Sequence, residues 1–335
     1  MNTQKQIRTA SKGCSFLPLV LLLVSVINGS VAISQTVDAS DKTYDKTVSI
    51  NHGIKTQGLW TATIENDRVT IYFKGDRNDE NYSSNTTFSL NEFSSLPKGQ
   101  QGEFKLTREA GTILFTGKFE GDKGSGKYHF IPEPSYNTFM LNQGLKESQA
   151  DDLFVFFLVN LKKDYVNVLH NYGYTHFTKN DLIPLAALGI DEAYIKFWKQ
   201  NGYENVTLSD LIPLKSLGVT VAYIKQLHDA GYDNISAKDL IPLKSLGITA
   251  DYIKGFVNLG YKHIPASDLI PLKSMGITPG YIKSFSDLGY TNIRIQDIIP
   301  LKSMGVTAGY ISSMKKKGFD YKDLNKYIQL KSLQD

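Results

Sequence analysis

Few residues of this 335-residue chain have the types and spacing that chemistry requires. The six histidines form no pair three or four residues apart, so they predict no metal-binding helix face. Serine does not occur in the Gly-x-Ser-x-Gly turn that exposes a nucleophile. The glycine-rich segment 121–126 lies between two expected strands and indicates a hairpin turn, not a phosphate loop. We therefore expect a protein that is not an enzyme and has no cofactor and no metal site.

A carboxylate recurs in the second half of the chain, in the motif Asp-Leu-Ile-Pro-Leu or its variant Asp-Ile-Ile-Pro-Leu. Such a series could supply oxygen ligands for calcium. However, the first three of these aspartates follow a serine or threonine by three residues, which is the spacing of a capping box at a helix N-terminus. The pattern therefore predicts a structural role for the series Asp181, Asp210, Asp239, Asp268 and Asp297.

Lysine is the residue whose spacing favours a binding function. One row, the first lysine row, comprises Lys215, Lys244, Lys273 and Lys302, and Lys331 continues it. The second lysine row has the same interval and comprises Lys196, Lys225, Lys254 and Lys283. If the repeats stack, each row becomes a line of positive charge to which an acidic polymer or an acidic strip on a protein could bind. The alternative is a solvated face whose charge the aspartates balance.

The interval between these residues is 29, and it governs the chain from about residue 134 onward. Two glycine series and a Tyr-Ile pair recur with the same interval. Each unit contains two short segments with apolar residues at helical spacing, and neither segment could bury its apolar face alone. Stacked neighbours bury such faces together, and atypical end units cap the stack. The sequence therefore predicts an α-solenoid of about six helix pairs over residues 134–335.

The start and stop signals of one unit are well defined. Ser236 and Asp239 form a capping box that opens the first helix, and Gly247 closes it in the left-handed conformation. Thr249 then caps the second helix. Pro242 falls inside the first helix, which predicts that this helix is short or kinked.

Residues 47–133 have a different period. Five segments alternate apolar and polar residues and are rich in β-branched and aromatic residues: 59–64, 69–73, 103–107, 112–116 and 127–131. Turn residues separate them, so the sequence predicts a small antiparallel β-domain of about six strands, either a meander or a sandwich. No long linker follows, which favours a fixed junction with the helices.

The N-terminus has the pattern of a signal peptide over residues 1–32. Three basic residues precede a 12-residue apolar run over 16–27, and small residues follow at Ser30 and Ala32. The sequence thus predicts export to the periplasm or the extracellular space, with a flexible mature N-terminus over 33–46. The alternative is an uncleaved anchor over 16–33 in the inner membrane, although the run is shorter than the roughly 20 residues of a membrane span.

Removal of the signal peptide changes the meaning of the composition. The net charge falls from +4 to +1, because residues 1–32 carry three basic residues and no acidic residue. The single cysteine, Cys14, also lies there, so the mature chain would have neither a disulfide nor a thiolate nucleophile. A nearly neutral, exported protein is not expected to bind nucleic acid. The oligomeric state is not predicted.

Three segments together resemble a known family. They are Gly58–Glu65, Arg108–Glu120 and the repeats of the form Gly-Tyr…Asp-Leu-Ile-x-Leu-Lys-x-x-Gly-Val-Thr-x-x-Tyr-Ile. They look like the extracytoplasmic C-terminal repeat region of some bacterial antirepressor metallopeptidases of the beta-lactam-sensor type. This sequence lacks the His-Glu-x-x-His motif of the peptidase. The resemblance therefore implies a stand-alone version of the non-catalytic module.

These observations lead to three functional hypotheses. The first is an exported, non-enzymatic scaffold whose solenoid surface binds a protein or an envelope polymer. The second, which follows from the resemblance, is a sensor or regulatory accessory related to antirepressor signalling. The third and weakest is a β-domain that carries a ligand or acts as a hydrolase, for example through an open lumen beside Trp60. A single Gly-x-Trp segment at Trp60 is a weak signal, and it is more typical of a packed core.

Overall fold

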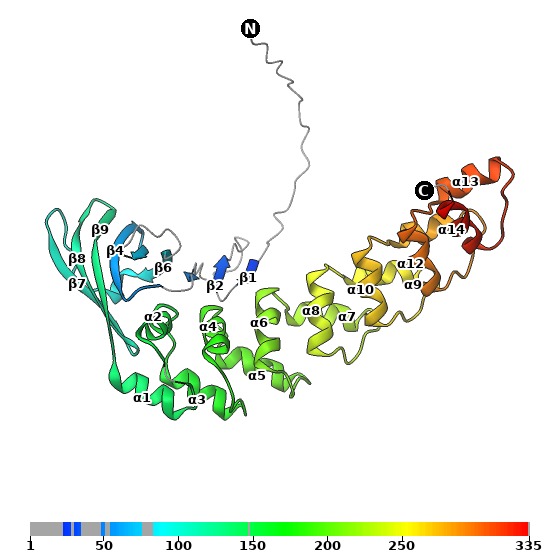
Figure 1. Cartoon of the computed structure of the whole chain (residues 1–335). Coiled ribbons are helices and arrows are strands. Elements are labelled where there is room, and N and C mark those ends of the chain that lie inside the picture. The colour runs from blue at the N-terminus through cyan, green and yellow to red at the C-terminus, as the bar shows by residue number, and fades with distance from the viewer. Residues whose placement is uncertain are drawn as a thin grey trace, which may run out of the picture.

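The structure is a computed structural model, and it describes residues 23–27, 30–34, 48–50, 54–75, 83–146 and 148–333. An antiparallel sheet over residues 57–132 precedes a long series of short helices (Figure 1). This order of a β part and an α part is the one that the sequence predicts.

Six strands form the body of the sheet: β4 (Gln57–Glu65), β5 (Arg68–Gly75), β6 (Ser83–Ser89), β7 (Gly102–Arg108), β8 (Gly111–Glu120) and β9 (Lys123–Pro132). Their order is β6-β5-β4-β9-β8-β7, and all neighbours are antiparallel. Each half is a meander of three consecutive strands, and the pairing of β4 with β9 joins the halves into one curled sheet. A 3₁₀ turn over Leu90–Glu92 begins at the capping box of Ser89 and Glu92.

Three further short strands extend the sheet beyond β6: β3 (Val48–Ile50), β2 (Ser30–Ser34) and β1 (Leu23–Ile27). Strands β1 and β2 use the C-terminal part of the expected signal peptide, so cleavage after Ala32 would remove β1 and shorten β2. Residues 1–22, 28–29 and 35–47 lie outside the described residues, and most of the predicted signal peptide and flexible N-terminus falls there.

The inner face of the sheet is filled by aromatic side chains. The Trp60 ring is 1% exposed and packs against Phe104, Phe115 and Phe119 at centroid distances of 5.4 to 5.8 Å. Its indole N–H donates to the Lys127 carbonyl at 3.0 Å. A Cβ at Gly117 would lie 2.6 Å from the Trp60 ring, so only glycine leaves room for this ring. Trp60 is therefore a core residue, and within the described part of the chain no lumen opens beside it.

Helix α2 (Ala150–Leu158) closes the end of the sheet. Its Phe154 stacks on Phe130 of β9 at a centroid distance of 4.8 Å. Arg108, at the end of β7, donates to the Phe157 and Leu158 carbonyls of this helix at 2.7 and 3.1 Å. The β part and the first helices therefore share one core, and the junction is packed.

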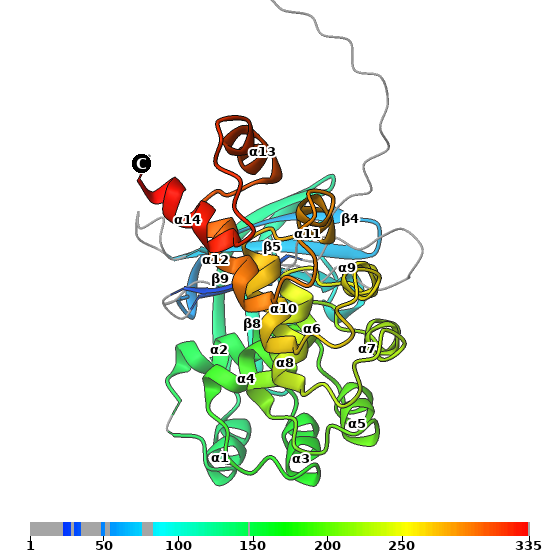
Figure 2. The ribbon, with the colours of Figure 1, turned by 90° about the vertical axis from the view of Figure 1, so that its right-hand side faces the viewer.

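The helices form two rows, which Figures 1 and 2 show side by side. The odd-numbered row contains α1 (Pro134–Asn142), α3 (Lys163–Asn171), α5 (Glu192–Gln200), α7 (Val221–His228), α9 (Ala250–Val257), α11 (Pro279–Ser286) and α13 (Ala308–Lys316). The even-numbered row contains α2, α4 (Lys179–Ala187), α6 (Leu208–Ser216), α8 (Ala237–Ser245), α10 (Ala266–Ser274), α12 (Ile295–Ser303) and α14 (Leu324–Ser332). Each even-numbered helix packs against the next.

Local signals define each helix, and packing stabilises it. Thr249 accepts a hydrogen bond from the Tyr252 N–H at the start of α9, and Gly247 has a φ of +64° just after α8. Pro242 lies inside α8, which is nine residues long and continues past it. The carbonyl that this proline leaves without a helical partner belongs to Lys238, an exposed residue that water can reach. Helices of eight or nine residues are marginal alone, so their stability comes from the shared core.

No described helix is both long enough and apolar enough to cross a membrane.

Candidate binding surface

Each lysine of the first row lies over the face of a tyrosine ring. The ammonium nitrogen of Lys215 is 4.6 Å from the centroid of Tyr194, and Lys244 is 4.6 Å from that of Tyr223. The same arrangement recurs for Lys273 over Tyr252 at 4.4 Å, Lys302 over Tyr281 at 4.9 Å, and Lys331 over Tyr310 at 5.4 Å. These distances are those of cation–π pairs. We call the five pairs the Lys–Tyr ladder.

The fold positions both partners of each pair. The lysine lies in the last turn of an even-numbered helix, where the helix dipole favours a cation. The tyrosine is in the first turn of the preceding odd-numbered helix, directly after its threonine cap. The lysine stems are half-buried, and burial lowers the pKa of Lys244. Within the part of the chain that the structure describes, no carboxylate forms an ion pair with Lys215, Lys244, Lys273 or Lys302.

Three tyrosines of the ladder are themselves held by hydrogen bonds from their hydroxyls. The hydroxyl of Tyr223 donates to the Ile248 carbonyl at 2.8 Å. Equivalent bonds join Tyr252 to Ile277 at 2.6 Å and Tyr281 to Val306 at 2.7 Å. Burial raises the pKa of Tyr223, Tyr252 and Tyr281 to about 12, which keeps these hydroxyls protonated donors. The rings under Lys244, Lys273 and Lys302 are therefore held in place by these bonds.

Tyr194 is the exception in this series. Its buried hydroxyl and the Nε1 of Trp198 meet no hydrogen-bond partner among the described residues. The next three helix pairs have Leu227, Phe256 and Phe285 where this pair has the larger Trp198. The ring centroids of Tyr194 and Trp198 lie 6.1 Å apart, and the Tyr194 hydroxyl does not make the carbonyl bond that Tyr223, Tyr252 and Tyr281 make.

A second tyrosine series ties the loops between helix pairs together. The hydroxyl of Tyr174 donates to the Val206 carbonyl at 2.7 Å, and Tyr261 donates to Ile293 at 2.6 Å. Tyr232 makes the equivalent bond to Ile264. Each bond spans 32 residues and so joins one helix pair to the next. The sequence pattern contains these tyrosines but does not show what they bind.

The second lysine row differs from the first. Its four lysines are exposed, and two of them form ion pairs within their own helix region. Lys225 lies 3.0 Å from Asp229, and Lys283 lies 2.6 Å from Asp287. Lys196 and Lys254 have no ion pair among the described residues. The structure therefore gives the two rows different surroundings: the first packs on tyrosine rings and has no ion pair among the described residues, whereas the second is exposed and partly neutralised by aspartates.

The recurring aspartates act as helix caps where a Ser or Thr precedes them. The Asp181 carboxylate accepts from both the backbone N–H and the hydroxyl of Thr178 at 2.8 Å. Asp210 accepts from the Thr207 hydroxyl at 2.7 Å. Asp297, which has no such neighbour, pairs with Arg294 at 2.7 Å. These contacts give Asp181, Asp210 and Asp297 structural roles.

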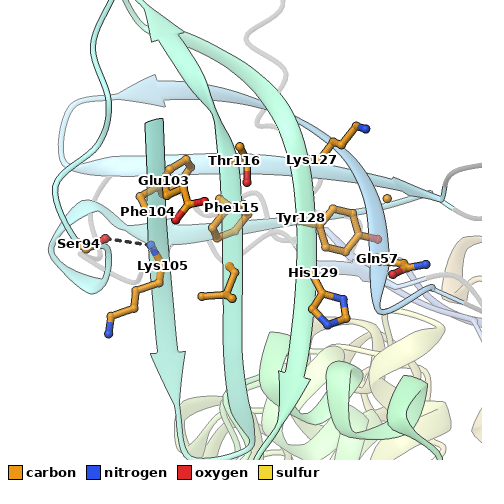
Figure 3. Close-up of a pocket in the computed structure, with 12 residues that line it drawn as sticks. Gln57, Ser94, Glu103, Phe104, Lys105, Phe115, Thr116, Lys127, Tyr128 and His129 are labelled. Carbon is orange, nitrogen blue, oxygen red and sulfur yellow. Dashed lines mark hydrogen bonds between the residues drawn. The ribbon is translucent and has the colours of Figure 1, made fainter. Parts of the chain in front are cut away.

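A trough of about 530 Å³ crosses the outer face of the sheet, opposite the aromatic core (Figure 3). Its walls include Glu103, Lys105, Leu114, Lys127 and His129, from strands β7, β8 and β9. Lys105, Leu114 and His129 are cross-strand neighbours in one line. The opposite charges in this lining point to no single ligand class. Sequence reasoning missed the trough because it depends on the register of three strands.

The described residues contain no group of three or more His, Cys, Asp or Glu side chains that could hold a metal ion.

No protein-family model, curated protein sequence or solved structure matches this chain.

Proposed function

We propose that this protein is a non-catalytic binding scaffold, in which an α-solenoid of 29-residue helix pairs follows the β-domain and binds an acidic partner along the first lysine row. The helix positions support the solenoid. From α4 to α12 the even-numbered helices begin at residues 179, 208, 237, 266 and 295, and from α5 to α13 the odd-numbered helices begin at 192, 221, 250, 279 and 308. Both series have an interval of 29 residues.

The observation that carries the proposal is the Lys–Tyr ladder. A tyrosine ring attracts a cation but neutralises no charge, so each ammonium group keeps its full charge and its N–H donors for a partner. The ring also restricts the lysine, which reduces the side-chain entropy that binding would otherwise cost. Repetition at one position of successive helix pairs gives an ordered line of positive charge. An acidic partner fits such a line.

The cellular setting of this scaffold is part of the same proposal. The basic segment, the apolar run and the small residues at Ser30 and Ala32 support export, and the partner would then be a protein or a polymer of the cell envelope.

The proposal is tested by capture from the native envelope fraction. The bait with Lys215, Lys244, Lys273 and Lys302 all replaced by Gln should retain much less of the captured partner than the unmodified bait. A bait with Lys196, Lys225, Lys254 and Lys283 replaced by Gln is the matched control, because it removes the same charge from the second row. Equal losses in the two variants would indicate an effect of net charge and would contradict a role for the ladder.

A further inference from the structure

We propose that the partner of the Lys–Tyr ladder is a linear acidic polysaccharide in which carboxylates are separated by neutral sugar units. This inference rests on the proposed function and names the class of partner. It follows from three properties of the ladder: the linear arrangement of its lysines, the low density of its charges, and its use of lysine and not arginine.

The lysines of the ladder form a line because they lie on even-numbered helices, each of which packs against the next even-numbered helix. Lys215, Lys244, Lys273 and Lys302 occupy the same position in α6, α8, α10 and α12, and each of these helices packs against the next. Packed helices lie about 8–10 Å apart, so successive ammonium groups are separated by about one helix layer. A long partner can therefore contact several lysines at once, and each additional contact raises its apparent affinity.

The charge density of the ladder is low, with one cation per helix layer. An extended acidic peptide places a residue every 3.3 Å or so, which gives about three residues for each layer. A continuous run of Glu or Asp would leave most of its carboxylates without a lysine. A sugar chain with one carboxylate in each disaccharide has a sparser series of charges, which fits the ladder better.

The ladder uses only lysine, and this also favours a flexible polymer. Arginine recognises a carboxylate through a planar fork with defined geometry, whereas lysine acts as a point charge with rotatable donors. A folded acidic protein with fixed carboxylates would select for arginine at some of these positions. The lysines are also half-buried, so a thin chain reaches them more easily than a broad protein surface.

The experiment uses hyaluronan oligosaccharides as the probe, because they carry one carboxylate per disaccharide. Binding to the full chain is measured at low salt for oligosaccharides of increasing length. Neutral chitin oligosaccharides of the same lengths and an oligomer of L-glutamate are the comparison ligands. We expect the affinity for hyaluronan to rise with length until the oligosaccharide spans the ladder. Chitin should not bind, and oligoglutamate should bind more weakly than hyaluronan of the same charge.

Two variants connect this binding to the ladder. Replacement of Lys215, Lys244, Lys273 and Lys302 by Gln should weaken binding of the longest hyaluronan oligosaccharide by about tenfold or more, since four charge contacts are lost. Replacement of the same four by Arg keeps the charge and the ring contact, so it should retain binding and show that the fold is intact. Circular dichroism of both variants checks folding directly.

The outcomes separate this inference from the proposed function. Tighter binding of oligoglutamate, with the same dependence on the four lysines, would overturn the polysaccharide and leave the scaffold with an acidic protein partner. Absence of hyaluronan binding, while envelope capture still depends on the ladder, would also overturn the inference alone. If hyaluronan binding does not change with length or in the Gln variant, the ladder is not its site and the inference is wrong.

Discussion

The ammonium nitrogen of Lys244 in α8 lies 4.6 Å from the ring centroid of Tyr223 in α7, and the hydroxyl of that tyrosine donates to Ile248, just beyond α8. One tyrosine thus contacts both the end of a helix and the loop that follows it. Related contacts recur along the helical rows. The consequence is that a residue of the proposed binding surface also contributes to the packing of successive helix pairs.

The Lys–Tyr contact should have a measurable but modest effect on stability. Replacement of Lys244 by Gln should lower the free energy of unfolding by about 0.5–1 kcal/mol, which is the range for a cation–π pair near the surface. Lys254 is the matched control, because it is exposed and has no ion pair among the described residues. Its replacement by Gln should change stability by less than about 0.5 kcal/mol. Equal effects in urea unfolding would contradict a stabilising ladder.

The tyrosine hydroxyls offer an internal comparison. Tyr252→Phe removes the bond to the Ile277 carbonyl and should cost about 1 kcal/mol. Tyr194→Phe removes a buried hydroxyl that meets no hydrogen-bond partner among the described residues, so it should be neutral or slightly stabilising. Chemical denaturation of the two variants gives the result. A loss at Tyr194 as large as that at Tyr252 would show that the Tyr194 hydroxyl does have a partner in solution.

Arg108 should be the most sensitive residue at the junction between sheet and helices. It lies 2.7 Å from Glu92, it donates to two carbonyls of α2, and its side chain is only 10% exposed. Burial lowers the pKa of Arg108, and Glu92 opposes this effect. Arg108→Met should cost about 3 kcal/mol, because it leaves the Glu92 carboxylate without its cation and the Phe157 and Leu158 carbonyls without this buried donor. Hydrogen exchange should show faster opening of α2.

Arg294 provides the control for that variant. It also pairs with a carboxylate, that of Asp297, but its side chain is 76% exposed. Arg294→Met should therefore change the free energy of unfolding by less than about 1 kcal/mol. If both arginine variants lose the same stability, burial at the junction is not what makes Arg108 important.

Alkaline pH should destabilise the helical part. The pKa of Tyr223, Tyr252 and Tyr281 is raised to about 12 in the folded protein, whereas a tyrosine in the unfolded chain has a pKa of about 10. Below about pH 10 the three hydroxyls are protonated in both the folded and the unfolded state, and their contribution to the free energy of unfolding is fully present. This contribution is lost as the pH rises towards 12. The lowered pKa of Lys244 has the opposite effect on stability, because the folded state releases that proton at a lower pH than the unfolded state. This effect comes from one lysine, whereas three tyrosines contribute to the alkaline loss.

The measurement is the melting temperature as a function of pH between about 8 and 12, followed by circular dichroism, with tyrosinate absorbance as a second signal. The variant with Phe at all three positions should show a flatter decline above about pH 10. An equally steep decline would assign the alkaline loss to other groups.

Local signals made much of this fold predictable. The alternation around Trp60, the capping box at Ser89 and the Thr249 cap all act within a few residues, and the structure has each of them. The pairing of β4 with β9 and the contact of Arg108 with α2 join distant segments, and no local pattern indicates them. The Lys–Tyr ladder is partly predictable. Its lysines and its tyrosines recur at the same interval in the sequence. Only the packing of the helices shows that the lysine of one helix pair contacts the tyrosine of the preceding helix pair.

The sequence therefore predicts which lysines form the candidate site, but it does not predict what their side chains contact. The sequence places the two lysine rows on equal terms. The structure separates them, because the first row meets tyrosine faces and the second meets solvent and aspartates such as Asp229.

Capture of the partner from the native envelope fraction tests the central claim most directly. The amount captured by the unmodified chain is compared with that captured by the variant with Gln at Lys215, Lys244, Lys273 and Lys302, and by the variant with Arg at the same positions. The account predicts strong loss with Gln, retention with Arg, and little change when the second row is replaced. Full capture by a folded Gln variant would contradict a binding role for the Lys–Tyr ladder.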